Sequence, residues 1–209
     1  MDVAAGLAYS GKVPFANTFA FLFATRALEM VRTHLCYDEA NVKLMAAYAG
    51  LSDSFDGPTH HAIIDIAIMR SLPHMTVVVP GDTVAVDRLL PQMAAWQGPV
   101  YFRLNRNEVP VIFDESYAPE IGKAVRLRAG ADVTLICNGM LVTAEEHSII
   151  GGLGSAVAKV VTEAHPVPVR RVGIADRFAE TGPYHAILER YGMDVSHIVA
   201  AAKAAVAAK

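Results

Sequence analysis

The sequence predicts an α/β protein built around a parallel sheet. Short apolar or β-branched runs alternate with segments that carry apolar residues at helical spacing, which is typical of parallel strands covered by helices. One polar segment, residues 53–61, lies between two apolar runs and contains two aspartates, two histidines and a Gly-Pro pair. Polar loops that follow buried strands carry the ligand-binding residues of many α/β proteins, so we expect chemistry here.

The N-terminal part alternates strand and helix up to about residue 111. Residues 3–8 indicate the tail of a buried helix that stops at Gly11, and apolar residues at helical spacing favour one helix over 19–34. Two further helices are expected at 61–70, before Pro73, and at 83–95. The expected strands are residues 13–17, 42–47, 76–79 and 100–104.

The C-terminal part repeats the alternation after a change in composition. Prolines and a glycine mark residues 110–130 as a linker with a small hairpin-like element. Beyond it we expect strands at 132–138 and 167–173. The expected helices are residues 152–163, 184–191 and the alanine-rich 195–208.

Composition excludes several classes of function. The chain has 18 basic and 21 acidic residues and no basic stripe, which argues against nucleic-acid binding. We find no signal peptide and no apolar run long enough to cross a membrane, so we expect a cytoplasmic protein. Cys36 and Cys137 are too few for a disulfide framework or a metal site, and we interpret both as buried free thiols.

Seven motifs stand in a characteristic order along the chain. They are 3–8 (VAAGLA), 14–19 (PFANTF), 56–60 (DGPTH), 69–73 (MRSLP), 79–82 (VPGD), 99–106 (PVYFRLNR) and 145–154 (EEHSIIGGLG). In this order and spacing they resemble the C-terminal half of a transketolase, and more specifically the small subunit of the split, two-chain form. The resemblance implies a pyrimidine-binding domain at 1–111, a linker at 112–130 and a smaller α/β C-terminal domain at 131–209.

The sequence departs from the family pattern at two places. A motif whose glutamate activates thiamine diphosphate by promoting its ylide stands, in the family, just before the segment that matches Met1. Residues 132–142 match the first strand of the family's C-terminal domain, and 143–147 match its third strand. We therefore expect one βαβ-sized segment, roughly 30 residues or more, to be missing between them.

The resemblance implies roles for particular side chains. Phe19, with Phe21, Leu22 or Phe23 beside it, would form the pocket for the aminopyrimidine ring of thiamine diphosphate. Asp56 and His60 would contact the hydroxyl groups of a ketose donor, and histidine suits proton transfer near neutral pH.

Three further residues match positions near the substrate in the family. Arg106 would bind the sugar phosphate, for which a guanidinium has a suitable planar geometry. Tyr48 replaces a histidine that relatives place near the same phosphate, and His61 replaces a frequent glutamine. Residues 151–154 and the cluster 145–147 are interpreted as structural.

The implied function is transfer of a two-carbon ketol unit between phosphorylated sugars, as in the pentose phosphate pathway. The large N-terminal subunit would hold the diphosphate and Mg²⁺, in an assembly of two large and two small chains. Two alternatives stay open. One is a 1-deoxyxylulose-5-phosphate synthase, whose loop has the same DGPTH motif; the other is a non-catalytic interaction protein that lacks the glutamate.

Overall fold

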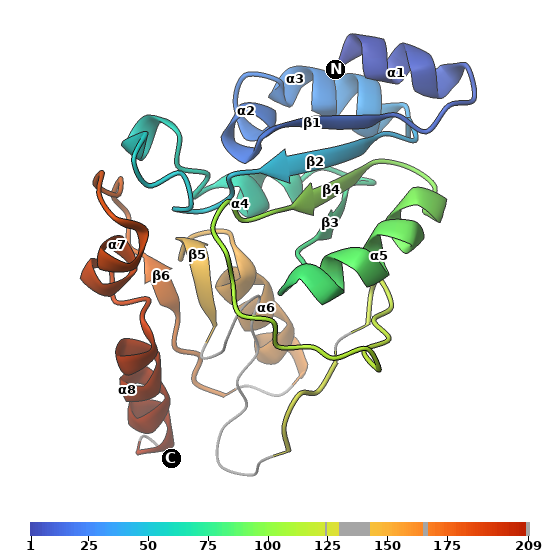
Figure 1. The fold of residues 1–209 in the computed structure, drawn as a ribbon. Coiled ribbons are helices and arrows are strands. Elements are labelled where there is room, and N and C mark those ends of the chain that lie inside the picture. The colour runs from blue at the N-terminus through green and yellow to red at the C-terminus, as the bar shows by residue number, and fades with distance from the viewer. Residues whose placement is uncertain (124, 130–142, 165–166, 208–209) are drawn as a thin grey trace. The chain divides into compact units, whose positions relative to one another are not determined.

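The computed structural model describes residues 1–123, 125–129, 143–164 and 167–207 (Figure 1). The chain divides into two compact units. The first contains Met1–Ala49 and Ile68–Arg126, and the second contains Gly50–Ala67 and Leu127–Lys209. The polar segment 53–61 thus groups with the C-terminal residues rather than with the strands that flank it in sequence. The domain boundaries expected from the sequence stay predictions.

The first unit contains a four-stranded sheet in which all neighbouring strands are parallel. In spatial order the strands are β1 (Phe15–Phe19), β2 (Lys43–Ala47), β4 (Val100–Arg103) and β3 (Thr76–Val78). The register places Ala46 of β2 beside Thr18 on one side and Arg103 on the other. The predicted α/β class with a parallel sheet is confirmed, and the carboxyl ends of β1, β2 and β4 lie at one edge.

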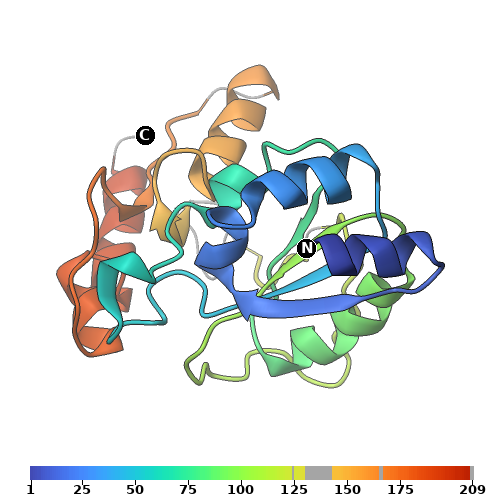
Figure 2. The same cartoon turned by 90° about the horizontal axis from the view of Figure 1, so that it is seen from above.

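Helices cover both faces of this sheet. In Figure 2, α5 and the α3–η1 segment lie on opposite sides of the strands. The helices of the unit are α1 (Asp2–Tyr9), α2 (Ala20–Ala24), α3 (Leu28–Met30), the π-helix η1 (Val31–Tyr37) and α5 (Thr83–Ala95). The apolar face of α5 packs on β3 and β4 in a core of Val78, Ala85, Leu89, Met93, Val100 and Phe102.

Two predictions for the first helices are wrong. The helix at the N-terminus exists as α1, but it is not buried, since Val3 is 79% exposed and only Ala5 is inside. The single helix expected at 19–34 is interrupted after α2. The Thr25 hydroxyl donates to the Phe21 carbonyl at 2.6 Å, and Thr25 leaves the helical conformation at φ −123°. Side-chain bonds of this kind compete with the helical ladder.

The segment after β4 is bound along α5. Asp82 caps the helix with one carboxylate oxygen and accepts the amides of Ile112 (2.8 Å) and Phe113 (2.9 Å) with the other. Burial acts to raise the pKa of Asp82, but these backbone amides outweigh it and lower the pKa. Gln92 donates to the Pro119 carbonyl at 2.7 Å. The described part of 112–129 contains no strand, so the predicted hairpin-like element is wrong.

A buried lysine stands at the start of β2. Lys43 is fully buried, and its Nζ donates to the Asn41 side chain (2.6 Å) and to the carbonyls of Trp96 (2.7 Å) and Gly98 (2.8 Å). Burial lowers the pKa of Lys43 to about 8. The ammonium group therefore joins the start of β2 to the turn between α5 and β4.

The second unit contains a pair of parallel strands, β5 (Ala144–Ser148) and β6 (Val172–Ile174). Its other elements are η2 (Gly57–Thr59), α6 (Leu153–Ala164), α7 (Tyr184–Arg190) and α8 (Val195–Val206), and α4 (Asp65–Met69) begins in it. The core joins the polar loop to the C-terminal elements through Leu51, Ile63, Ile174, Ala179, Ile187 and Met193. The strand expected at 132–138 and Cys137 lie outside the described residues.

Within the described ranges, we find no helix with the length and apolar character required to cross a membrane.

Candidate active-site residues

Three predicted site residues meet at the carboxyl ends of neighbouring strands. Phe19 ends β1, Tyr48 follows β2 directly, and Arg106 lies three residues beyond β4. The Tyr48 ring stacks on Phe19, with centroids 4.4 Å apart and planes at 26°. The Arg106 guanidinium carbon lies 4.9 Å from the centroid of the Tyr48 ring. Because β1, β2 and β4 are neighbours in the sheet, the three side chains at their carboxyl ends form one stack.

Tyr48 adopts an unusual backbone conformation. Its φ is +59°, in the left-handed region that costs an L-residue with a side chain roughly 1–2 kcal/mol. The aromatic stack and the cation–π contact each contribute stabilisation of about 0.5–1 kcal/mol, which offsets this strain. Such strained residues cluster at ligand sites, where the surrounding structure holds them in place.

The aromatic cluster after β1 is only partly accessible. Phe19 and Phe21 are half-buried, with ring centroids 6.2 Å apart, and Leu22 is half-buried beside them. Phe23 is fully buried and packs edge-on against Tyr101 at 6.4 Å. Half-exposed aromatic rings suit stacking against a heteroaromatic ring such as aminopyrimidine. Phe23 offers no exposed surface for that contact, whereas Phe19, Phe21 and Leu22 do.

Asp56 and His60 flank the short helix η2 in the second unit. Asp56 is exposed and stands at its N-terminal end, and His60 is half-buried at its C-terminal end with Nδ1 3.0 Å from the Thr59 hydroxyl. Gly57 has φ +78°, and a Cβ there would collide with the Thr181 hydroxyl. Glycine is therefore required for the turn that separates the two polar side chains.

His61 is buried without a hydrogen bond to either ring nitrogen within the described part of the chain. Burial lowers the pKa of His61, the neighbouring His60 lowers it further, and the backbone carbonyl of Asp53 acts in the opposite direction. Buried polar groups are nearly always hydrogen-bonded, so this imidazole is a notable exception.

The loop 50–67 is fixed to the C-terminal elements by backbone hydrogen bonds. Ser148 donates its amide to the Ile63 carbonyl at 2.7 Å, and Gly182 donates to Ser54 at 3.1 Å. Across the loop itself, Ala62 donates to Gly50 at 2.9 Å. The position of Asp56 and His60 is therefore set by the second unit.

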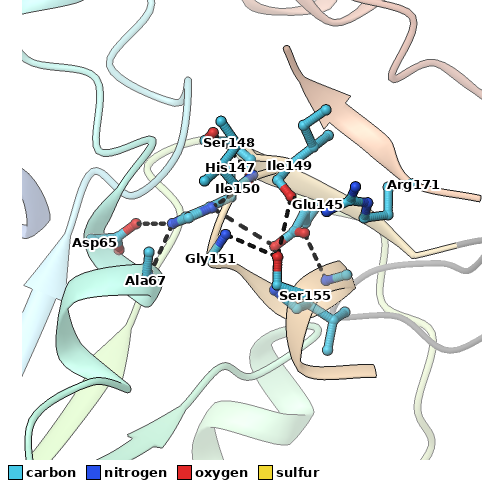
Figure 3. A network of polar contacts seen from close by, with 12 residues as sticks. Asp65, Ala67, Glu145, His147, Ser148, Ile149, Ile150, Gly151, Ser155 and Arg171 are labelled. Atoms are coloured by element: carbon cyan, nitrogen blue, oxygen red, sulfur yellow. Dashed lines mark hydrogen bonds and ion pairs between the residues drawn. The ribbon is translucent and has the colours of Figure 1, made fainter. Parts of the chain in front are cut away.

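A network of polar groups joins β5 and the start of α6 to Asp65 and Ala67 at the start of α4 (Figure 3). The buried Glu145 carboxylate accepts the amides of Leu153 (2.6 Å) and Gly154 (2.9 Å) at the start of α6. His147 is fully buried and contacts the backbone of Ala67. The structural interpretation of 145–147 agrees with these contacts. The sequence did not reveal the link from His147 to Ala67, although a histidine inside an apolar strand is a signal for a buried polar partner.

Comparison with known families identifies this architecture. The family model described as "Transketolase, pyrimidine binding domain" matches residues 1–111, and "Transketolase, C-terminal domain" matches residues 137–198. The chain belongs to the transketolase family. The site residues described above lie in these matched segments, so each transketolase assignment made from the sequence refers to a position within them.

Relatives of similar organisation are transketolase subunits. The 6-deoxy-6-sulfo-D-fructose transketolase subunit of Clostridium sp. (strain MSTE9) is 34% identical over 97% of this chain and 76% of its own length. An apulose-4-phosphate transketolase subunit of Phocaeicola vulgatus is 31% identical over 93% of this chain and 76% of its own length. A solved structure described as a split gene transketolase, inactive beta4 tetramer, is 38% identical, with a TM-score of 0.91 over 99% of this chain and 80% of that one.

The alignment lengths bear on the predicted internal gap. The alignment with the Clostridium subunit spans 246 positions, whereas this chain has 209 residues, so at least 37 aligned positions have no residue here. This excess is of the size of a βαβ unit. The location of the gap between 142 and 143 stays a prediction.

Proposed function

We propose that this chain is the small, C-terminal subunit of a split transketolase, which transfers a two-carbon ketol unit between phosphorylated sugars together with a large N-terminal subunit. The observation that carries the proposal is the stack of Phe19, Tyr48 and Arg106 at the carboxyl ends of β1, β2 and β4. Ligands of open parallel sheets bind at this edge. Family membership supports the same reaction class.

Thiamine diphosphate supplies the nucleophilic carbon that accepts the ketol unit when it is bound. This chain's contribution is a stacking surface from Phe19, Phe21 and Leu22 for the aminopyrimidine ring. The diphosphate and Mg²⁺ belong to the large subunit in this proposal. Two large and two small chains would form the active assembly.

Arg106 binds the terminal anion of the sugar. Its guanidinium is exposed and lies over the Tyr48 ring in a cation–π contact. A planar guanidinium can donate two parallel hydrogen bonds to an anion of this kind. The names of two relatives, a sulfofructose and an apulose-4-phosphate transketolase subunit, both specify sugars that carry such an anion. We infer a ketose with a terminal phosphate or sulfonate as the donor.

Asp56 and His60 orient the sugar hydroxyl groups, and His60 moves a proton during cleavage and formation of the carbon–carbon bond. His61, whose ring nitrogens have no hydrogen-bond partner among the described residues, contributes a hydrogen bond to the substrate. The rigid attachment of the loop supports these roles, since such contacts require fixed geometry.

The test is a reconstituted complex of this chain with the large transketolase subunit of the same organism, thiamine diphosphate and Mg²⁺. Ketol transfer from fructose 6-phosphate to an aldose phosphate is measured for the wild type, Arg106→Gln and Arg32→Gln. Arg32 is an exposed arginine paired with Glu29 and serves as the charge-matched control. We expect Arg106→Gln to raise KM for the phosphorylated donor about 10–100-fold, as loss of a charged hydrogen-bond pair does, and Arg32→Gln to leave it unchanged.

Two outcomes would support the alternatives instead. Condensation of pyruvate with glyceraldehyde 3-phosphate, without ketol transfer, would favour a 1-deoxyxylulose-5-phosphate synthase. Tight binding to the large subunit without any turnover would favour a non-catalytic role.

A further inference from the structure

We propose that His147 is a positioning residue for the loop that carries Asp56 and His60. A single tautomer of its imidazole ring fixes this loop through a hydrogen bond to the backbone of Ala67. The inference rests on the proposed function of those two residues. All groups involved belong to the second unit, and Figure 3 shows how the imidazole lies between β5 and the start of α4.

The hydrogen bonds of His147 select one tautomer. Its Nε2 accepts the Ala67 amide at 3.2 Å, so this nitrogen carries no proton. Its Nδ1 lies 2.7 Å from the Ser148 carbonyl oxygen, which can only accept, so Nδ1 carries the proton. A ring protonated at both nitrogens would turn a donor toward the Ala67 amide and break that bond.

The site allows the ring little freedom. His147 and Asp65 are fully buried, and the carboxylates of Asp65 and Glu145 flank the ring at 4.0 Å from Nε2 and 3.9 Å from Nδ1. Glu145 is itself held by the amides at the start of α6. A Cβ at Gly152 would collide with both Glu145 and His147, so close packing closes the remaining side.

Residues on either side of His147 hold the two ends of the loop. Ser148 donates its amide to Ile63, and Gly151 packs against the Ala67 side chain. On the other side, Glu146 lies so close to Gly50, where the loop begins, that a Cβ at Gly50 would collide with it. Residues of β5 and the turn after it therefore contact the loop at both of its ends, and His147 adds a side-chain hydrogen bond to the Ala67 amide.

The proposed reaction requires the loop to be held in a fixed position. Asp56 and His60 act by geometry, and a displacement of about 1 Å at a substrate-positioning residue can reduce turnover about 10²-fold. The His147 side chain does not need to contact the substrate for this role. The C-terminal unit thus takes part in catalysis by holding the loop.

Two near-isosteric variants separate positioning from general destabilisation. Glutamine places its amide oxygen where Nε2 lies and can still accept the Ala67 amide, whereas asparagine reaches only the Nδ1 position. We compare His147→Gln and His147→Asn in the reconstituted complex by kcat and KM for the donor, affinity for thiamine diphosphate, thermal midpoint and amide hydrogen exchange of residues 50–67.

We expect His147→Asn to lower kcat/KM for the donor about 10²-fold and to accelerate exchange at Ala67 tenfold or more. His147→Gln should restore both to within a few-fold of the wild type, and both variants should bind thiamine diphosphate normally. Equal activity of His147→Asn and wild type overturns the inference, as does an equal loss in both variants that follows their thermal midpoints. If the wild type shows no ketol transfer, the proposed function fails, and unequal exchange in the two variants still decides whether His147 holds the loop.

Discussion

The buried Lys43 makes the stability of the first unit depend on pH in an unusual direction. Burial lowers its pKa from 10.5 to about 8, so the folded chain releases this proton before the unfolded chain does. Between these pH values the unfolded state binds more protons, and stability therefore rises with pH. Below pH 8 the lysine is charged in both states, and above about 10.5 it is neutral in both.

The size of the effect follows from the same shift. A difference of about 2.5 pKa units corresponds to about 3 kcal/mol at most, at 1.36 kcal/mol per unit. Between pH 7 and pH 10 we expect Lys43 to add about 2–3 kcal/mol to the free energy of unfolding. Other groups titrate in the same range, so the effect is isolated by comparison with Lys43→Met, which cannot titrate.

The assay is urea unfolding at pH 7, 8, 9 and 10, followed by the fluorescence of Trp96. Trp96 is the single tryptophan of the chain, lies in the first unit, and its carbonyl accepts a hydrogen bond from Lys43. The difference in unfolding free energy between wild type and Lys43→Met should change by about 2–3 kcal/mol in favour of the wild type as pH rises. Parallel pH curves for the two proteins would refute the reasoning.

Three further predictions concern single side chains. Asp82→Ala should destabilise the first unit by about 1–2 kcal/mol, measured by urea unfolding, because it removes the α5 cap and leaves two amides of the following segment unpaired. Gly57→Ala should lower the thermal midpoint and raise KM for the donor, since both the positive φ and the Thr181 hydroxyl oppose a side chain there. Tyr48→Phe should keep KM for a phosphorylated donor within about twofold, whereas Tyr48→Ala should raise it about two- to fivefold, since it removes a cation–π contact with Arg106 worth about 0.5–1 kcal/mol.

Local patterns predicted most of the first unit. The helix expected at 83–95 is α5 with the same bounds, because Asp82 is a strong N-cap and the apolar residues keep helical spacing. The strands failed only at their ends: β1 begins at Phe15, after Pro14, which has no amide to donate. The prediction of one continuous helix at 19–34 was wrong, because the spacing of apolar residues does not reveal that the Thr25 hydroxyl competes for the Phe21 carbonyl.

Long-range contacts could not be predicted in the same way. The apolar runs on either side of 53–61 predict burial, but they do not say which residues bury them. In the structure, Leu51 and Ile63 join a core with Ile174 and Ile187, more than a hundred residues later. The buried Lys43 is a similar case. A single charged residue in an apolar strand does not indicate which groups accept its hydrogen bonds, and here they are the nearby Asn41 side chain and the distant carbonyls of Trp96 and Gly98.

For the candidate site too, the sequence predicted which residues are involved but not how they are arranged. The sequence named Phe19, Tyr48 and Arg106 separately, and the parallel order of β1, β2 and β4 explains why they meet. Only the structure shows that Tyr48 holds a left-handed conformation to enter this stack. Since the strain and the stacking energies are of similar size, about 1–2 kcal/mol, the stack adds little to stability. Tyr48 therefore holds the Arg106 guanidinium over its ring without a net gain in stability, as the proposed anion-binding role of Arg106 requires.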